Sequence, residues 1–423
     1  MSTAAETSPS LVGPTDSPAA EISPDLESAP YLETSAGTAG GLSLREAVRR
    51  SLTFSPAVQA ASIEIDAKRA EAFQAGLRPN PDLAGDIQNI GQDPEESTIE
   101  LSQVILLGGK RLKRVRAAEL DVGVAAWDYE AARLRAASVT AEAFVDVLAS
   151  QERIKILGEL LVVSGKFRKA VDERVKAGVV SPVELTRTEI EVIRAESQLN
   201  EEKAILTVTK RRLANNWGAS SANFTVARGE LATTNHIPSA DQLGSYLAYN
   251  PDVARWTVEM TRREAILNLA QAQRIPDLTI GAGARNVKEG DETGALVSLS
   301  IPLPLFDRNQ GNIQAAQTRV FKGRRESLAA RIDVTGVFLE AYGRLLAASE
   351  RLKALENEIL PKAKEVYDAT VGGYAEGKFD FLLVLDAQRT LFSTRLDIVN
   401  ARAEFQKAKV QIEALIGRGL YDS

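Results

Sequence analysis

Cysteine is absent from the 423 residues, methionine occurs twice and histidine once. Without cysteine the chain forms no disulfide, thiolate zinc site, iron–sulfur cluster or cysteine nucleophile, and it carries no cysteine-linked lipid. The lone histidine, His236, has no partner at metal-ligand spacing and is interpreted as a surface residue. Histidine-based acid–base chemistry is therefore not expected. We predict no enzyme activity and no catalytic, cofactor-binding or metal-binding residue.

Aromatic residues make up only 5% of the sequence, and no apolar run approaches the roughly 18 residues of a membrane-spanning helix. If the protein crosses a membrane, it must therefore do so with strands. Charges of both signs are interspersed and the net charge is −6, so there is no basic footprint for nucleic acid. Alanine, in contrast, is abundant, and this composition favours long helices with close contacts.

The start of the sequence has no basic residue and no apolar core. Residues 1–41 are rich in Ser, Thr, Pro, Ala and Glu, and the first basic residue is Arg45. This composition predicts a disordered or extended segment. A signal peptide needs a positive region followed by an apolar one, and neither is present. Two alternatives stay open: the protein is not exported, or the sequence as given lacks its export signal.

An internal repeat is the most informative feature of the sequence. The triplet Pro81-Asp82-Leu83 recurs as Pro276-Asp277-Leu278, at an offset of 195 residues. The pair Leu101-Ser102 recurs as Leu299-Ser300, at an offset of 198, and Gly178 recurs as Gly377. A nearly constant offset over about 160 residues indicates a duplicated domain rather than a solenoid of short repeats.

Each half has the same order of elements: a helix, a Pro-Asp-Leu break, two strands with alternating apolar residues, a very long helix, a glycine-containing turn and a returning helix. Pro361 is expected to kink the second long helix. The expected organisation is as follows: a disordered or extended segment at 1–41; a first repeat at 42–218, with strands at 82–90 and 97–104 and helices at 110–175 and 182–216; a linker at 219–240; a second repeat at 241–418, with strands at 277–287 and 293–301 and helices at 309–374 and 381–416; and a tail at 419–423.

The strand pairs have the length that crosses an outer membrane when tilted. Four strands cannot close a barrel, and an open edge cannot face lipid. The chain is therefore expected to share a barrel with copies of itself, giving eight, twelve or more strands. A helix of 66 residues spans about 100 Å, so the helices extend far from the membrane. Such an object is a conduit.

Several segments carry a resemblance to a known family. The segment YAEGKFDFLLVLDAQRTLFSTR (374–395) resembles the second helical-hairpin tip of the TolC family, the outer-membrane factors of tripartite RND-type efflux pumps. Its first-half counterpart is RVKAGVVSPVELTRTEIEVIRAESQL (174–199). The segments LSQVILLGGKR and LSIPLPLFDRNQGNI most resemble the heavy-metal CzcC and CusC branch. The resemblance covers residues 42–418.

The resemblance implies a mainly helical fold with a small β part. It implies a homotrimer, with a 12-stranded outer-membrane barrel continued by a 12-helix periplasmic barrel. Its partners would be outer-membrane lipid, a periplasmic adaptor and an inner-membrane RND pump, in a Gram-negative bacterium. The duct would conduct cargo passively, with heavy-metal cations such as Co, Zn, Cd, Ni or Cu expected. The missing export signal suggests a processed, truncated or misassigned start.

The resemblance also assigns roles to the hairpin tips. One tip contains a Tyr–acid pattern that closes the pore in the family, matched here by Tyr374 and Asp386. Phe379 and Leu383 stand where some relatives carry charged gate residues, so the resemblance implies fewer polar contacts at the gate or a more apolar closure. Glycine capping and helix N-capping are an alternative role for the tips that is compatible with docking. The residues expected to contact the adaptor are Gly178, Val179, Val180, Ser181, Pro182, Gly377, Lys378, Phe379 and Asp380.

Two alternatives to a metal duct stay open. One is a duct of the same family for organic compounds, since cargo identity does not follow from the sequence. The other is a soluble coiled-coil scaffold, which has no need of strand pairs at matching places in both halves. Glycines such as Gly123, Gly158 and Gly336 also interrupt the heptad pattern that a scaffold would keep.

Overall fold

The computed structural model describes residues 41–91, 95–231, 237–288 and 292–417. These form two compact units, and each is considered by itself. The strand unit comprises the described residues of 61–129 and 254–330. The hairpin unit comprises the described residues of 24–60, 130–253 and 331–423. Each unit therefore contains segments from both halves of the sequence.

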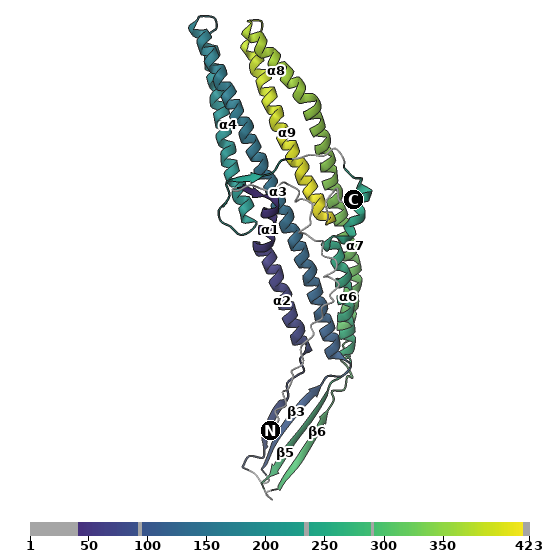
Figure 1. Ribbon diagram of the computed structural model, residues 1–423. Helices are drawn as coiled ribbons and strands as arrows, with labels where there is room; N and C mark the ends of the chain where they lie inside the picture. The colour runs from purple at the N-terminus through teal and green to yellow at the C-terminus, as the bar shows by residue number, and fades with distance from the viewer. Residues whose placement is uncertain (1–40, 92–94, 232–236, 289–291, 418–423) are drawn as a thin grey trace, which may run out of the picture. The chain divides into compact units, whose positions relative to one another are not determined.

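The strand unit contains a four-stranded antiparallel sheet with the order β2-β3-β5-β6 (Figure 1). The two central strands come from different halves of the sequence, and Leu101 lies opposite Ala282. The bounds lie within two residues of those expected from the alternation. The strands are β2 (Asp82–Gln88), β3 (Glu96–Ile105), β5 (Leu278–Val287) and β6 (Glu292–Ser300).

One face of this sheet carries exposed apolar side chains. Leu83 pairs with Leu101, and both are more than half exposed. On the edge strand β6, Val297 and Leu299 are 80% and 68% exposed. Successive residues of a strand point to opposite faces, so Glu100 and Ser298 lie on the other face, where the Ser298 hydroxyl donates to the Glu100 carboxylate. The sheet thus has one apolar and one polar face.

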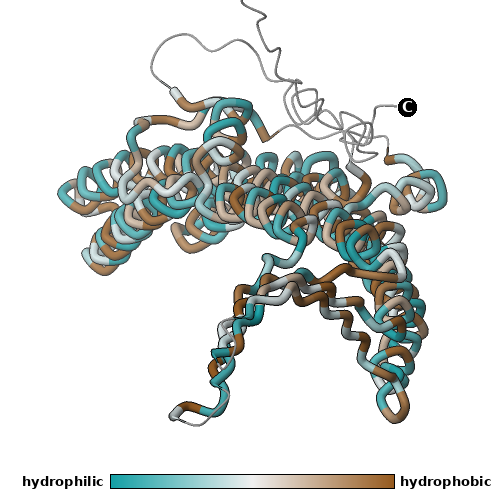
Figure 2. Tube along the Cα trace, turned by 90° about the horizontal axis from the view of Figure 1, so that it is seen from below, coloured by the Kyte–Doolittle hydropathy of each residue, from teal (hydrophilic) through white to brown (hydrophobic). Residues whose placement is uncertain are grey.

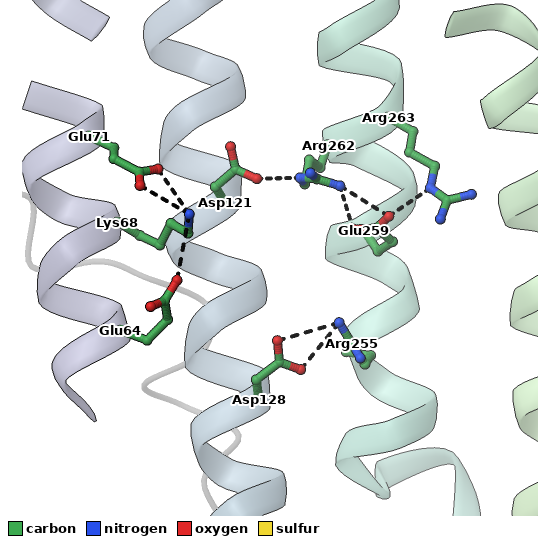
Figure 3. Close-up of polar contacts among 9 residues, drawn as sticks. All are labelled: Glu64, Lys68, Glu71, Asp121, Asp128, Arg255, Glu259, Arg262 and Arg263. Atoms are coloured by element: carbon green, nitrogen blue, oxygen red, sulfur yellow. Dashed lines mark hydrogen bonds and ion pairs between the residues drawn. The ribbon is translucent and has the colours of Figure 1, made fainter. Parts of the chain in front are cut away.

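The helices of the strand unit are joined largely by charge. Asp121 and Asp128 on α3 bind Arg262 and Arg255 on α6, as Figure 3 shows. Arg263 on α6 binds Glu326 on α7 at 2.8 Å. Buried apolar residues here are few and mostly small, with Ala117, Leu120 and Ala265 at the centre. The helices that contribute are α2 (Pro56–Gly76), α3 (Lys110–Lys176), α6 (Pro251–Ala272) and α7 (Gln310–Ala354).

The hairpin unit has larger apolar cores. Phe338 and Phe405 are almost fully buried in one cluster, and Phe144 is buried in another. Besides the continuing parts of α3 and α7, its helices are α1 (Leu44–Phe54), α4 (Pro182–Asn215), α5 (Ala240–Gly244), α8 (Leu360–Ala375) and α9 (Phe381–Ile416), with a 3-10 turn η2 (Ser245–Tyr249). In Figure 2, hydrophobic and hydrophilic residues interleave along the helices. In the described part of the chain, no helix is both long and apolar enough to cross a membrane.

The second long helix is interrupted where the proline predicts it. The α-helical hydrogen-bond pattern stops at Ala354 and gives way to a π-helical segment, η3 (Leu355–Ile359), before α8 begins. Pro361 lies in the first turn of α8, where its missing N–H costs nothing. The wider π turn accommodates the proline ring, which would otherwise clash with the carbonyl four residues earlier.

Two expectations need correction or lie outside the structure. Gly41, expected in the disordered segment, begins the strand β1 (Gly41–Ser43), which pairs in parallel with β4 (Val226–Arg228) inside the expected linker. Three-residue strands are too short to show an alternating pattern, so periodicity predicts neither of them. Residues 1–40, His236 and the tail at 419–423 lie outside the described residues.

Candidate functional site

The first hairpin tip is built by a glycine turn and a serine cap. After α3 ends, Gly178 has φ +70°, and the Val179 N–H donates to the Arg174 carbonyl at 2.9 Å. Only glycine adopts this left-handed conformation without strain, so the glycine ends the helix. The Ser181 side chain then accepts from the Val183 N–H at 3.3 Å, and Pro182 begins α4.

The second tip repeats this construction with different residues. Gly377 has φ +74°, and the Lys378 N–H donates to the Gly373 carbonyl at 2.8 Å. The Asp380 carboxylate accepts from the Leu383 N–H at 3.1 Å and so caps α9. The expected capping roles of Gly178, Ser181, Gly377 and Asp380 are therefore present.

Apolar side chains remain exposed at both tips. Val179 is 62% exposed, and Phe379 is 43% exposed. The Phe379 ring covers Gly373, where the Cβ atom of any other residue would collide with it. Among the nine tip residues, only Val180 is partly covered. Exposed apolar residues at the end of a rigid hairpin are typical of a protein–protein contact surface.

Tyr374, one of the two expected gate residues, is buried and is only 7% exposed. Its ring lies 5.4 Å from the ring of Phe167 on α3 and 6.5 Å from that of Phe381 on α9. The Arg174 guanidinium lies 4.5 Å above the Tyr374 ring, and its Nη1 donates to the Tyr374 carbonyl at 3.1 Å. Tyr374 therefore connects the first hairpin to the second within one chain.

The Tyr374 hydroxyl is buried without a hydrogen-bond partner in the described part of the chain. Burial raises the pKa of Tyr374, while the charge of Arg174 lowers it and that of Glu184 on α4 raises it. The phenol therefore stays neutral throughout the physiological range. A buried, unsatisfied hydroxyl is a costly feature that aromatic contacts must offset.

Asp386, the other expected gate residue, is exposed on α9. It forms no ion pair or hydrogen bond with any residue that the structure describes. The two expected gate residues therefore differ in environment: Tyr374 is packed inside the chain, whereas Asp386 is free to face solvent or a neighbouring molecule.

Sequence reasoning missed the contacts that hold the tips together. Phe167 and Arg174 are seven residues apart and so lie on the same face of α3. A bulky aromatic residue about three turns before the glycine turn, in a chain with few aromatics, was a usable signal. Its partner Tyr374 lies in the other half of the sequence, 200 residues beyond Arg174. Within the described residues, no group of three or more His, Asp or Glu side chains could hold a metal ion.

Comparison with known proteins defines the class. The sequence profile of the outer membrane efflux protein family matches residues 47–219 and 243–418, one match in each half. The chain belongs to this family, and the family membership expected from the sequence is confirmed. The mainly helical fold with few strands is that of the family's channels.

Individual relatives refine this assignment. The chain is 33% identical over 380 residues to the cobalt-zinc-cadmium resistance protein CzcC of Cupriavidus metallidurans, covering 90% of this chain and 91% of that protein. It is 24% identical over 309 residues to the nickel-cobalt-cadmium resistance protein NccC of Alcaligenes xylosoxydans xylosoxydans, covering 72% and 70%. Crystal structures of CusC superpose with a TM-score of 0.75 at 15% identity, covering 92% of this chain and 96% of that one.

Proposed function

We propose that the chain is the exit duct of a tripartite efflux system in the outer membrane of a Gram-negative bacterium and that its cargo is heavy-metal cations. The observation that carries this proposal is the similarity to a cobalt-zinc-cadmium resistance protein over 90% of the chain. The nickel-cobalt-cadmium relative supports the same class of cargo. The duct binds no cofactor and conducts passively, and the pump supplies the energy.

The working form in this proposal is a homotrimer. Three copies of the four-stranded sheet would supply a 12-stranded barrel in lipid, and the helices of three chains would line a tunnel in the periplasm. The exposed apolar face of the sheet supports this, because such a face is stable only when lipid or protein covers it.

The hairpin tips are the proposed contacts with a periplasmic adaptor, which links the duct to an inner-membrane pump. The exposed apolar residues Val179 and Phe379 support this role. Tyr374 and Asp386 are proposed to act in pore closure, with Tyr374 fixing one hairpin on the other and Asp386 free to face the pore.

A duct for organic compounds is the second candidate. A pyoverdine export outer membrane protein, OpmQ of Pseudomonas putida, is 23% identical over 297 residues, which cover 68% of this chain. The identity and the coverage are lower than for the cobalt-zinc-cadmium relative. Metal cations are therefore the favoured cargo.

The adaptor role is tested with one substitution at two places. Val179→Asp places a charge at the first tip, and Val208→Asp places the same charge on the same helical hairpin away from the tip. The two valines are 62% and 65% exposed, so the control is matched. The proposal predicts that Val179→Asp weakens adaptor retention on immobilised duct by about tenfold or more and that Val208→Asp does not. Equal retention by both variants would contradict the adaptor contact.

A further inference from the structure

Among the described residues, the sheet of the strand unit has two open edges, with no further strand beside them. Strand β2 forms one edge of the sheet and β6 the other. Next to them, α2 lies beside α3, where the Arg114 guanidinium donates to the carbonyls of Ala75 and Leu77, and α7 lies beside α6. An open edge strand is normally protected from, or paired with, another strand. Each of these two edges is therefore expected to be covered by another element or another chain.

The joint between the two halves shows how such an edge is closed inside the chain. Where β3 and β5 meet, the Lys110 ammonium binds the Asp277 carboxylate at 2.7 Å, and the Leu107 N–H donates to the same oxygen at 3.0 Å. The turn between β3 and α3 is thus held to the start of β5. Both side chains are largely covered, which strengthens the ion pair relative to one in open solvent.

The internal repeat places a counterpart of each of these two charges at the open edges, a basic residue at one edge and an acidic residue at the other. At the offset of 198 that relates Leu101 to Leu299, Lys110 corresponds to Arg308, just before α7. At the offset of 195 that relates Pro81 to Pro276, Asp277 corresponds to Asp82, the first residue of β2. Arg308 and Asp82 are both exposed, and neither forms an ion pair within the described residues.

In the trimer proposed above, we propose that Arg308 at one open edge of the strand unit pairs with Asp82 at the opposite edge of the next copy. This contact repeats between copies the Lys110–Asp277 joint inside the chain. A head-to-tail contact of this kind forms a closed ring when the rotation that relates one copy to the next adds up to a full turn over all copies. The proposal rests on the trimer proposed above and adds the residues that assemble it.

The helices beside the edges support the same partner. Within the chain, Gly123 on α3 lies so close to Val258 on α6 that an added Cβ would be 3.0 Å from it. The corresponding residues at the open edges are Phe321 on α7 and Ile63 on α2, which are 55% and 67% exposed. Large apolar residues on complementary edges favour association, because association removes them from water.

The charges of the two edge helices are also complementary. Residues 310–330 of α7 contain four basic side chains and one acidic one. Residues 61–76 of α2 contain three acidic side chains and two basic ones. A second copy therefore brings opposite net charge to each edge, as a heterologous contact requires. An unrelated partner would have to match both edges independently.

Charge reversal tests the proposed pair in detergent-extracted protein. Asp82→Arg and Arg308→Asp each place like charges opposite one another, and the double variant restores an opposite pair. The matched control is Glu350→Arg, since Glu350 is exposed on α7 in the hairpin unit, away from the open edges, and binds Lys353 of its own helix at 2.8 Å. The proposal predicts that each single reversal raises the midpoint concentration of assembly about tenfold or more, that the double variant recovers it, and that the control leaves it unchanged.

Cysteine cross-linking gives a second readout that does not depend on the strength of assembly. The chain contains no cysteine, so Ile63→Cys with Phe321→Cys introduces the only thiols. The proposal predicts disulfide-linked dimers and trimers for the double variant and none for either single variant. If the wild type is a trimer, the charge-reversal variants assemble as the wild type does and the double cysteine variant does not cross-link, the contact is overturned while the proposed duct stands. A wild-type monomer in detergent would overturn both the contact and the proposed assembly.

Discussion

The strand unit and the hairpin unit are stabilised in different ways. The hairpin unit buries Phe144, Phe338 and Phe405 in apolar clusters of its own. The strand unit buries mostly alanine-sized residues and joins its helices through ion pairs (Figure 3). Several of its large apolar residues, such as Val297 and Phe321, are exposed.

This difference indicates that the hairpin unit is the one stabilised by contacts within a single chain. Large buried side chains stabilise the hairpin unit by removing apolar area from water. Ion pairs near the surface contribute little each, and salt weakens them. The strand unit therefore depends more on what covers it, which in our proposals is lipid and the next copy of the chain.

The largest effect is expected in the core of the hairpin unit. Phe405→Ala removes a ring that is 1% exposed and is expected to lower the free energy of unfolding of that unit by about 3–5 kcal/mol. The matched substitution Phe321→Ala, at an exposed ring of the strand unit, is expected to change the stability of the single chain by less than about 0.5 kcal/mol. Amide hydrogen exchange in α9 and in residues 310–330 measures both. Equal losses at the two sites would remove the contrast between the units.

The next effect concerns the ion pairs of the strand unit. Glu259 is only 8% exposed and binds both Arg262 and Arg263. Arg263→Met leaves this carboxylate with one partner, so we expect a loss of about 1–3 kcal/mol, measured by hydrogen exchange in α6. Arg324→Met, on the exposed side of α7, serves as the control and should have little effect. An Arg263→Met variant as stable as the control would show that the network is dispensable.

A smaller effect is expected at the junction of the two tips. Tyr374→Phe removes the unpartnered hydroxyl and keeps the ring, so the tip should be unchanged or stabilised by up to about 1 kcal/mol. Because burial raises the pKa of Tyr374, the native state keeps its proton longer than the unfolded state as the pH rises. The stability from this group is thus full below about pH 10 and is lost above it. Thermal unfolding from about pH 9 to about pH 11, the range in which an ordinary tyrosine ionises, should show a larger loss in wild type than in the Phe variant, which keeps the raised pKa of Tyr367.

The smallest effect is expected at Glu142 on α3. Burial raises its pKa, Lys407 lowers it, and Asp146 raises it, while Arg344 and Arg212 lower it further. A raised carboxyl pKa contributes stability that is present below the unfolded value and is lost as the pH rises through the folded value. Glu142→Gln should remove this loss and stabilise the hairpin unit at neutral pH by less than about 1 kcal/mol, because solvent screens a half-buried group. Denaturant unfolding at about pH 4 and about pH 7, on either side of the usual ionisation of a glutamate, measures this effect. Identical pH profiles of variant and wild type would exclude this role.

Patterns among residues close in sequence predicted many elements of the fold. The alternation at Ile99 and Leu101 located a strand, and Gly178 and Gly377 located the tips, because both signals depend on neighbours in sequence. The order of the strands in the sheet could not be predicted from such local patterns, because the pairing of β3 with β5 joins residues nearly 200 positions apart. The same limit explains why the packing of Tyr374 on Phe167 escaped prediction: the identities of its neighbours are set by tertiary packing.

The central claim, a duct for metal cations, is tested most directly by cellular metal content. Cells that lack this gene would be loaded with cobalt, zinc or cadmium, and the retained metal would be measured by mass spectrometry after transfer to metal-free medium. We expect the wild-type gene and Val208→Asp to restore metal release, whereas Val179→Asp does not. Retention that is the same with and without the wild-type gene would contradict a role of this chain in metal export.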